Sequence, residues 1–251
     1  MTLPHITTKQ QEILLLIYKF RFLNRPQIQT LLHHKNTKNI NTWLQDLTQK
    51  NYLEKIINNN TKLNTTPYKY YLSTNGIKFL KTQSICKKEY LTKLYKEEKR
   101  SEQFIDRCLF IANIYIYLHQ KYKNIPGFAF YTQSDYTPAG IIKEIFPHCV
   151  FRKKEGQPYF VIELFADTMP RFAIRARIAL YTTFFIHEDW TKNEQLPNIL
   201  FICPDQKMEK YVIRFANKIY QEESIKINIF ISTKDQVAEQ SIEGEIWKKI
   251  E

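Results

Sequence analysis

The architecture of the N-terminal third of the chain can be read from one segment, Thr37-Lys38-Asn39-Ile40-Asn41-Thr42-Trp43-Leu44-Gln45-Asp46-Leu47-Thr48-Gln49-Lys50. Its apolar side chains follow the spacing i, i+3, i+4 and i+7, with Ile40, Trp43, Leu44 and Leu47. This spacing predicts a helix that buries all four side chains in one stripe. The opposite face carries polar and amide side chains, namely Lys38, Asn39, Asn41, Thr42, Gln45 and Gln49. Such a face is either merely solvated or a contact surface for a polar partner.

Two helices are predicted before this segment, and a β-hairpin is predicted after it. Thr7-Thr8-Lys9-Gln10-Gln11 offers capping boxes for the first helix, and Asn24-Arg25-Pro26-Gln27 places a proline near the first turn of the second. Residues 52–57 and 67–72 are predicted strands, because the Asn-rich stretch between them suits a turn. Ser73-Thr74-Asn75-Gly76 then opens a closing helix.

Three helices, a hairpin and a closing helix make a winged helix, which we expect from residue 5 to about residue 85, in a first domain of residues 1–85. The segment Tyr71-Leu72-Ser73-Thr74-Asn75-Gly76-Ile77-Lys78-Phe79-Leu80 resembles the YxLTxxGxxxL ending common in winged-helix proteins. In this fold the third helix enters the major groove of DNA, where amides suit base edges and cations suit phosphates. We therefore expect contacts to double-stranded DNA from Arg25, Lys38, Asn39, Asn41, Thr42, Gln45 and Lys62.

The charge distribution supports this expectation. The formal net charge is +12, and residues 1–90 hold 14 Lys and Arg against 4 Asp and Glu, whereas residues 91–251 hold 23 against 21. A genome rich in A and T would raise the lysine count everywhere, but it would not make acidic residues scarce only in the first third. The asymmetry indicates a polyanion-binding domain joined to a nearly neutral one.

The sequence lacks the motifs that are typical of several classes of protein. The four cysteines are far apart, which argues against a zinc site or a disulfide framework and suits a reducing cytoplasm. Phosphate-binding and hydrolase motifs are missing, so we expect no cofactor and no metal. No signal peptide is visible, and the apolar stretches are too short to span a bilayer. We expect a cytoplasmic protein without membrane insertion.

The remainder of the chain predicts a linker over residues 86–100, rich in Lys and Glu and partly helical, and an α/β domain over residues 101–251. A helix from Ser101 precedes three strands, a helix and a strand, and a further helix and strand follow. The predicted strands are residues 129–133, 141–151, 159–165, 198–203 and 225–232, and the later helices are 171–185 and 207–220.

The order helix, three strands, helix, strand is that of the PD-(D/E)xK nuclease core. Those enzymes hold a divalent metal with a carboxylate after a proline and another on the next strand, followed two residues later by a lysine. Here the positions are taken by His148, Glu163 and Phe165. A single carboxylate is a poor magnesium site, so we expect a degenerate, non-catalytic core. A buried Glu163 must be paired or protonated, and the candidate partners are Arg171, Arg175 and Arg177.

The whole chain resembles the replication-relaxation family of plasmids and integrative conjugative elements. The matching pieces are Thr8-Lys9-Gln10-Gln11-Glu12-Ile13-Leu14, Arg21-Phe22-Leu23-Asn24-Arg25-Pro26-Gln27-Ile28, Pro147-His148-Cys149-Val150-Phe151, Tyr159-Phe160-Val161-Ile162-Glu163, Leu180-Tyr181 and Leu196-Pro197-Asn198-Ile199-Leu200-Phe201. The family shows Pro-Asp where this chain has His148, and an acidic residue where it has Phe165. The resemblance implies a non-catalytic DNA-binding accessory factor in replication or transfer of a mobile element, acting beside a helicase or relaxase.

Two other functions stay open on the sequence. One is a winged-helix transcription regulator whose second domain dimerises or senses a ligand, and the other is a metal-dependent nuclease. The sequence leaves the DNA site, the protein partner and the oligomeric state undetermined.

Overall fold

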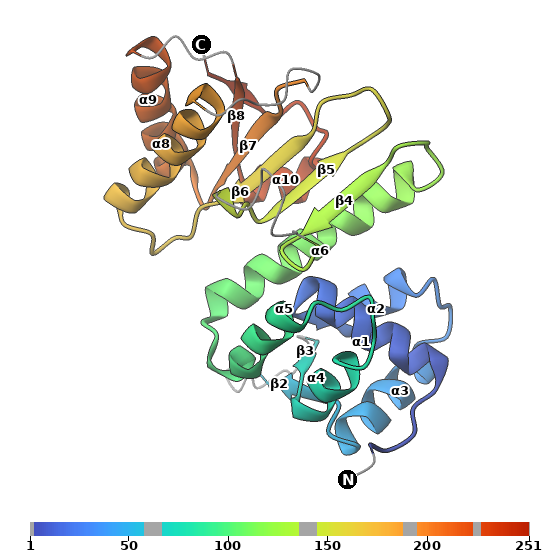
Figure 1. Cartoon of the computed structure of the whole chain (residues 1–251). Helices are drawn as coiled ribbons and strands as arrows, with labels where there is room; N and C mark the ends of the chain where they lie inside the picture. The colour runs from blue at the N-terminus through green and yellow to red at the C-terminus, as the bar shows by residue number, and fades with distance from the viewer. Residues whose placement is uncertain (1–2, 58–66, 136–144, 188–194, 223–226, 251) are drawn as a thin grey trace. The chain divides into compact units, whose positions relative to one another are not determined.

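A computed structural model describes residues 3–57, 67–135, 145–187, 195–222 and 227–250. The chain divides into two compact units, Met1–Ile116 and Tyr117–Glu251, and the division falls inside helix α6 (Glu102–Tyr122). Each unit has its own sheet, as Figure 1 shows. Within the described residues, no helix combines the length and the apolar composition that a membrane crossing requires.

The N-terminal unit contains the predicted helices and hairpin in the predicted order, and it adds the short strand β1 between the first two helices. Its elements are α1 (Thr8–Phe20), β1 (Leu23–Asn24), α2 (Arg25–Leu31), α3 (Thr37–Gln49), β2 (Leu53–Ile56), β3 (Lys69–Leu72), α4 (Thr74–Leu80), α5 (Lys88–Lys93), the 3-10 helix η1 (Leu94–Lys99) and the first part of α6. The strands form an antiparallel sheet in the order β1-β3-β2. Capping boxes begin α1 at Thr7 and α2 at Asn24, which confirms both predicted helix starts.

The buried stripe of α3 is narrower than predicted. Ile40, Leu44 and Leu47 are buried, but Trp43 is only half-buried and packs edge-on against His34, with ring centroids 5.0 Å apart. Trp43 lies at the border of the stripe, where the imidazole of His34 packs against it. The prediction that all four side chains are buried is therefore wrong for Trp43.

Gly76 shows why the closing helix needs a glycine. A Cβ atom at this position would lie 2.3 Å from the carbonyl oxygen of Tyr52. The Ser73 amide donates to that same carbonyl at 3.1 Å, and its hydroxyl donates to the Asn51 carbonyl. The start of α4 is thus held against the backbone that leads into β2, and a larger side chain would push the two apart.

Residues 86–100, where we expected a linker, are mostly helical and pack into the N-terminal unit. Tyr90, Leu91, Leu94 and Glu97 are buried, and Glu97 forms an ion pair with Arg21. The first part of α6 packs here too, because Ile105 and Cys108 share a core cluster with Phe22 and Tyr71. The few apolar residues in this Lys- and Glu-rich stretch are spaced to face one way, so composition alone conceals their burial.

The C-terminal unit is built on a six-stranded mixed sheet in the order β4-β5-β6-β7-β8-β9. The strands are β4 (Ala129–Thr132), β5 (Cys149–Arg152), β6 (Phe160–Leu164), β7 (Asn198–Cys203), β8 (Asn228–Thr233) and β9 (Lys248–Lys249). Pairing is parallel for β6-β7-β8 and antiparallel for the outer pairs. The predicted strand at 141–151 is shorter, and its residues 141–144 lie outside the described residues.

The helices that follow the central strands of this sheet are α8 (Arg171–His187), α9 (Gln206–Glu222) and α10 (Lys234–Gln240). Helices α8 and α9 lie side by side on one face of the sheet (Figure 1), where Ile178 and Val212 join one apolar core with Ile199 and Ile229. Strand β6 is almost entirely buried, as its continuous apolar run predicts. Helix α10 and strand β9 are additions that the sequence pattern did not reveal.

Candidate nucleic-acid interface

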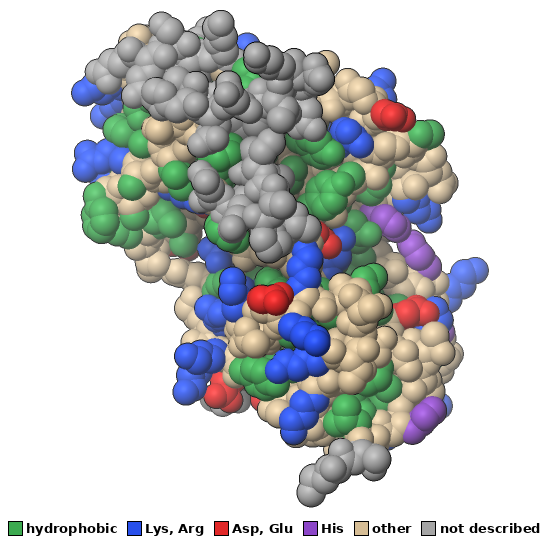
Figure 2. Space-filling view, in the orientation of Figure 1, with side chains coloured by type: hydrophobic (Ala, Val, Ile, Leu, Met, Phe, Trp, Pro, Cys, Tyr) green, Lys and Arg blue, Asp and Glu red, His purple; other side chains and the backbone are tan. Residues whose placement is uncertain are grey.

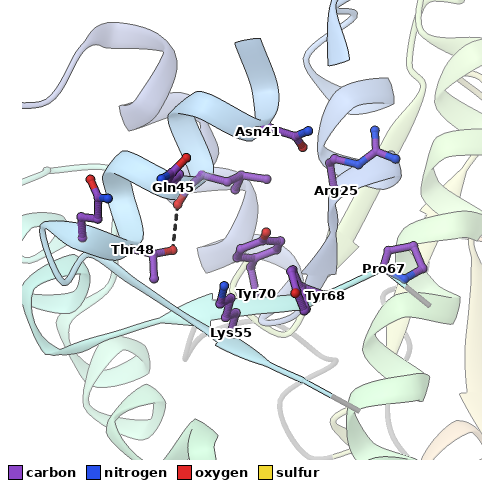
Figure 3. Close-up of a pocket in the computed structure, with 10 residues that line it drawn as sticks. Arg25, Asn41, Gln45, Thr48, Lys55, Pro67, Tyr68 and Tyr70 are labelled. Carbon is purple, nitrogen blue, oxygen red and sulfur yellow. Dashed lines mark hydrogen bonds between the residues drawn. The ribbon is translucent and has the colours of Figure 1, made fainter. Parts of the chain in front are cut away.

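A groove of about 670 Å³ lies on the N-terminal unit between α3 and the β2-β3 hairpin. It is lined by Arg25, Asn41, Leu44, Gln45, Thr48, Gln49, Lys55, Pro67, Tyr68 and Tyr70. Figure 3 shows these side chains converging from α2, α3 and both strands of the hairpin. Three of the residues predicted to contact DNA, Arg25, Asn41 and Gln45, line this groove.

Helix α3 forms one wall of the groove with the face that adjoins its buried stripe, and Leu44 of the stripe is part of the lining. Asn41 and Gln45 are exposed there one helical turn apart, and Thr48 follows three residues later. The Thr48 hydroxyl donates to the Leu44 carbonyl at 2.7 Å, so it is already bonded within the helix (Figure 3). Among the described residues, the amides of Asn41 and Gln45 have no hydrogen-bond partner. They are therefore available to donate to, and accept from, a ligand in the groove.

The hairpin forms the other wall through one face of its two strands. Lys55 pairs with Tyr70 across β2 and β3, and Tyr68 precedes Tyr70 by two residues, so the three side chains share a face. The Lys55 ammonium lies 4.5 Å from the ring centroid of Tyr68, whose side chain is 40% exposed. Tyr70 is buried, and desolvation raises the pKa of its hydroxyl. Lys55 and Tyr68 are not among the residues predicted from the sequence, although the two-residue alternation of strands could have identified them.

Arg25 contributes a cation from the first residue of α2. Its guanidinium donates to the Gln29 side chain at 3.1 Å, which fixes the long side chain against its own helix. The charge of Arg25 also acts on Tyr70, where it opposes the rise in that hydroxyl's pKa. The groove therefore carries positive charge from both Arg25 and Lys55, and the described residues of its lining include no acidic one.

The acidic side chains nearest in sequence are bonded elsewhere. Asp46 accepts from the Gln10 amide at 2.6 Å and from the Lys50 ammonium at 2.8 Å, and these bonds lower the pKa of its carboxyl group. Glu54 accepts from the Tyr71 hydroxyl at 2.5 Å, on the other face of the hairpin from Lys55. The few acidic residues near the groove are therefore paired with other side chains. Figure 2 shows Lys and Arg side chains spread over this unit.

Three other predicted residues, all on α3, fall outside the groove lining. Lys38, Asn39 and Thr42 are exposed on α3, and the Thr42 hydroxyl donates to the Lys38 carbonyl at 3.0 Å. Lys38 precedes Asn41 by three residues and therefore lies on the same side of the helix. Lys62 lies outside the described residues.

Glu163 is the centre of a second polar cluster, in the core of the C-terminal unit. Its side chain is 3% exposed, and its Oε2 atom accepts from Arg177 at 2.7 Å and from the Tyr181 hydroxyl at 2.8 Å. Burial opposes the charge of Arg177, but the bond to Glu163 outweighs it and raises the pKa of the guanidinium. Of the three predicted arginine partners, the structure selects Arg177.

His148 lies beside this cluster. Its Nδ1 atom lies 3.4 Å from Glu163 Oε1, but it accepts a hydrogen bond from the Leu164 amide at 3.1 Å. An imidazole nitrogen that accepts in this way carries no proton, which places the proton of a neutral ring on Nε2. Phe165 is fully buried in the apolar core. In the described part of the chain, no group of three or more His, Cys, Asp or Glu side chains is placed to hold a metal ion.

Known proteins match parts of this chain. No curated protein matches it. Among solved structures, a mutant of S. aureus MepR bound to an oligodeoxyribonucleotide is similar at 20% identity, over 46% of this chain and 80% of that one, with a TM-score of 0.27. A likeness at that score does not establish a shared fold. The model of the replication-relaxation family matches residues 14–199, which include the groove, all of α8 and the Glu163 cluster. The chain belongs to the replication-relaxation family.

Proposed function

We propose that the N-terminal unit is a winged helix that binds double-stranded DNA, and that the protein is an accessory factor in the replication or transfer of a plasmid or other mobile element. The observation that carries the proposal is the groove between α3 and the hairpin. It combines two unpaired amides, Asn41 and Gln45, with two cations, Arg25 and Lys55. Amides suit base edges and cations suit phosphates, and a hairpin beside a recognition helix can follow the DNA backbone.

We further propose that the C-terminal unit is a degenerate PD-(D/E)xK core without catalytic activity. Its element order α6, β4, β5, β6, α8, β7 is that of the nuclease core, which supports the assignment. Glu163 is held by Arg177 and Tyr181, so a metal ion would have to displace a guanidinium that already neutralises the carboxylate. Phe165 supplies no cation at the position where those enzymes place their lysine. The unit would then serve replication by binding rather than by cleavage, beside a helicase or relaxase.

The test measures binding of the full chain to a labelled duplex by fluorescence anisotropy over a range of salt concentrations. We expect micromolar or tighter binding whose logarithm falls linearly with the logarithm of salt concentration. The variant Arg25→Ala with Lys55→Ala should bind all duplexes more weakly. Lys78→Ala, which removes an exposed cation from α4 away from the groove, is the control. Equal binding by the groove variant and the control would refute the proposed interface.

The remaining parts of the proposal need separate assays. Incubation of the purified protein with supercoiled plasmid and Mg²⁺ or Mn²⁺ should leave the plasmid intact, and nicking that is lost in Glu163→Ala would overturn the non-catalytic assignment.

Capture from the native host should enrich a relaxase or a helicase. Binding restricted to a single palindromic operator would instead indicate a transcription regulator.

A further inference from the structure

A second groove, of about 470 Å³, lies on the C-terminal unit between the start of α8 and helix α9. It is lined by Arg171, Gln206, Lys207, Lys210, Tyr211 and Arg214. Four of these six side chains are cations, and none is acidic or aliphatic. Small-molecule sites are lined mostly by apolar side chains, so this composition points to an extended polyanion instead.

Helix α9 sets the spacing of three of these cations. Lys207, Lys210 and Arg214 follow the spacing i, i+3 and i+7, which places them along one exposed edge of the helix. Seven residues of helix rise by about 10 Å, and a DNA strand advances about 3.4 Å along the axis per nucleotide. The row is therefore long enough to reach phosphates of several successive nucleotides. Figure 2 shows Lys and Arg side chains at the edge of this unit.

Arg171 is held at the groove by an aromatic partner. Its guanidinium carbon lies 4.8 Å from the ring centroid of Tyr211, and the Tyr211 hydroxyl is 3.5 Å from the Arg171 carbonyl oxygen, to which it donates. A guanidinium stacked on a ring keeps its N–H donors in its own plane, and this geometry suits bidentate contact with a phosphate. The stacking also reduces the side-chain entropy that Arg171 would lose on binding.

The acidic side chains of the same segment do not neutralise the row. Glu209 is buried and accepts from Lys248 at 2.7 Å, and Asp205 accepts from the Met208 amide at 2.6 Å at the start of α9. Among the described residues, Arg171, Lys207, Lys210 and Arg214 form no ion pair. Four like charges around one groove repel one another, so an anion bound there relieves their repulsion.

We infer that this groove, which we call the α8–α9 groove, binds the phosphodiester backbone of DNA and gives the protein a second contact that does not read sequence. The proposal extends DNA binding to a unit whose net charge is nearly neutral. It uses no residue of the groove between α3 and the β2-β3 hairpin, which we call the α3 groove. The two sites can therefore be tested and refuted separately.

The experiment compares two full-length triple variants that remove the same charge. The test variant is Lys207→Gln, Lys210→Gln, Arg214→Gln, and the control variant is Lys123→Gln, Lys154→Gln, Lys249→Gln, which changes three exposed lysines of the same unit outside the groove. Binding to a random-sequence duplex of about 30 base pairs is measured by fluorescence anisotropy at several salt concentrations. All substituted side chains are exposed, and unchanged thermal unfolding verifies the fold.

We expect the test variant to lower affinity at low salt by about tenfold or more and to reduce the salt slope by about 0.9 for each phosphate that is no longer neutralised, up to about 3. The control should bind as the unsubstituted protein does. Equal salt slopes in the two variants would overturn the inference. The inference would also fail if a polyglutamate peptide bound in this groove and the affinity for the duplex stayed unchanged. If the test variant loses affinity while Arg25→Ala with Lys55→Ala does not, the α8–α9 groove stands and the α3 groove fails.

Discussion

The α3 groove and the Glu163 cluster are both built from polar side chains that the sequence marks as unusual, and they differ in how those groups are satisfied. In the groove, the amides of Asn41 and Gln45 are exposed and have no partner among the described residues. In the cluster, Glu163 is buried and bonded to Arg177 and Tyr181. A polar group that the fold leaves unpaired on a concave surface can bind a ligand, whereas one that the fold already pairs in the core supports the structure.

Truncating the chain after the N-terminal unit should have the largest effect on stability. A fragment of residues 1–122 retains all of α6, whereas a fragment of residues 1–90 lacks the Lys69–Asp106 ion pair and the bonds from Gln27 to Leu109 and Asn113. We expect the longer fragment to unfold cooperatively and to bind DNA. The shorter one should show no cooperative transition, because Phe22 and Tyr71 are then without their core partners. Circular dichroism during thermal unfolding distinguishes them, and equal stability would show that α6 is not part of this unit.

Removing one partner of the buried pair should have the next largest effect. Arg177→Met leaves the Glu163 carboxylate buried without its cation, and we expect the free energy of unfolding to fall by about 3–5 kcal/mol. Glu163→Leu combined with Arg177→Met should recover much of this loss, because two apolar groups need no partners. Urea unfolding measures both variants. A single variant as stable as the unsubstituted protein would mean that the cluster is not structural.

Two neighbours on α3 should differ in the stability they contribute. Leu44→Ala removes a fully buried side chain and should cost about 2–5 kcal/mol. Trp43→Ala should cost less, because its indole is half-buried and packs against His34 rather than in the stripe. Chemical denaturation of both variants checks the order. A greater loss of unfolding free energy for Trp43→Ala than for Leu44→Ala would support the prediction that Trp43 belongs to the buried stripe.

The exposed amides should affect recognition and leave stability almost unchanged. Asn41→Ala with Gln45→Ala should reduce discrimination between duplexes by about 1–3 kcal/mol for each base that is no longer read, with a change in unfolding free energy within about 0.5 kcal/mol. Anisotropy titrations with a preferred duplex and a random duplex measure the difference. Thr92→Ala, which changes an exposed side chain of α5 outside the groove lining, is the control. Unaltered discrimination in the double variant would mean that a different face of α3 reads DNA.

A smaller effect should come from pH. Glu243 accepts from Lys121, Lys153 and Tyr122, and although burial opposes its charge, these bonds lower the pKa of its carboxyl group to about 2. Its contribution to stability is fully present above the pKa of an unfolded glutamate, about 4.3, and is lost as the pH falls toward 2. Thermal unfolding of Glu243→Gln should therefore differ from that of the unsubstituted protein at pH 7 and converge with it near pH 2. A constant difference across this range would exclude the ionic contribution.

The sequence by itself determined the local elements of this protein. Capping residues such as Thr7 and Asn24 sit within a few residues of the amides they bond, and apolar periodicity is read within a single helix. The strand at 198–203 and the starts of α1, α2 and α8 are accordingly where the pattern places them. The exposed amide face of α3 follows for the same reason, because the buried stripe fixes which sides of the helix remain exposed.

Only the tertiary structure decided which distant residues meet. Three arginines were equivalent candidates for Glu163, and the packing of α8 on the sheet brings Arg177 alone to hydrogen-bond distance. Lys55 and Tyr68 join Asn41 because the hairpin register places them on the groove side, and residues 86–100 are buried because an adjacent core accepts them. A short stretch of sequence determines the periodicity of a helix or strand. The choice among partners far apart in the chain depends instead on three-dimensional packing, and no short stretch of sequence contains that information.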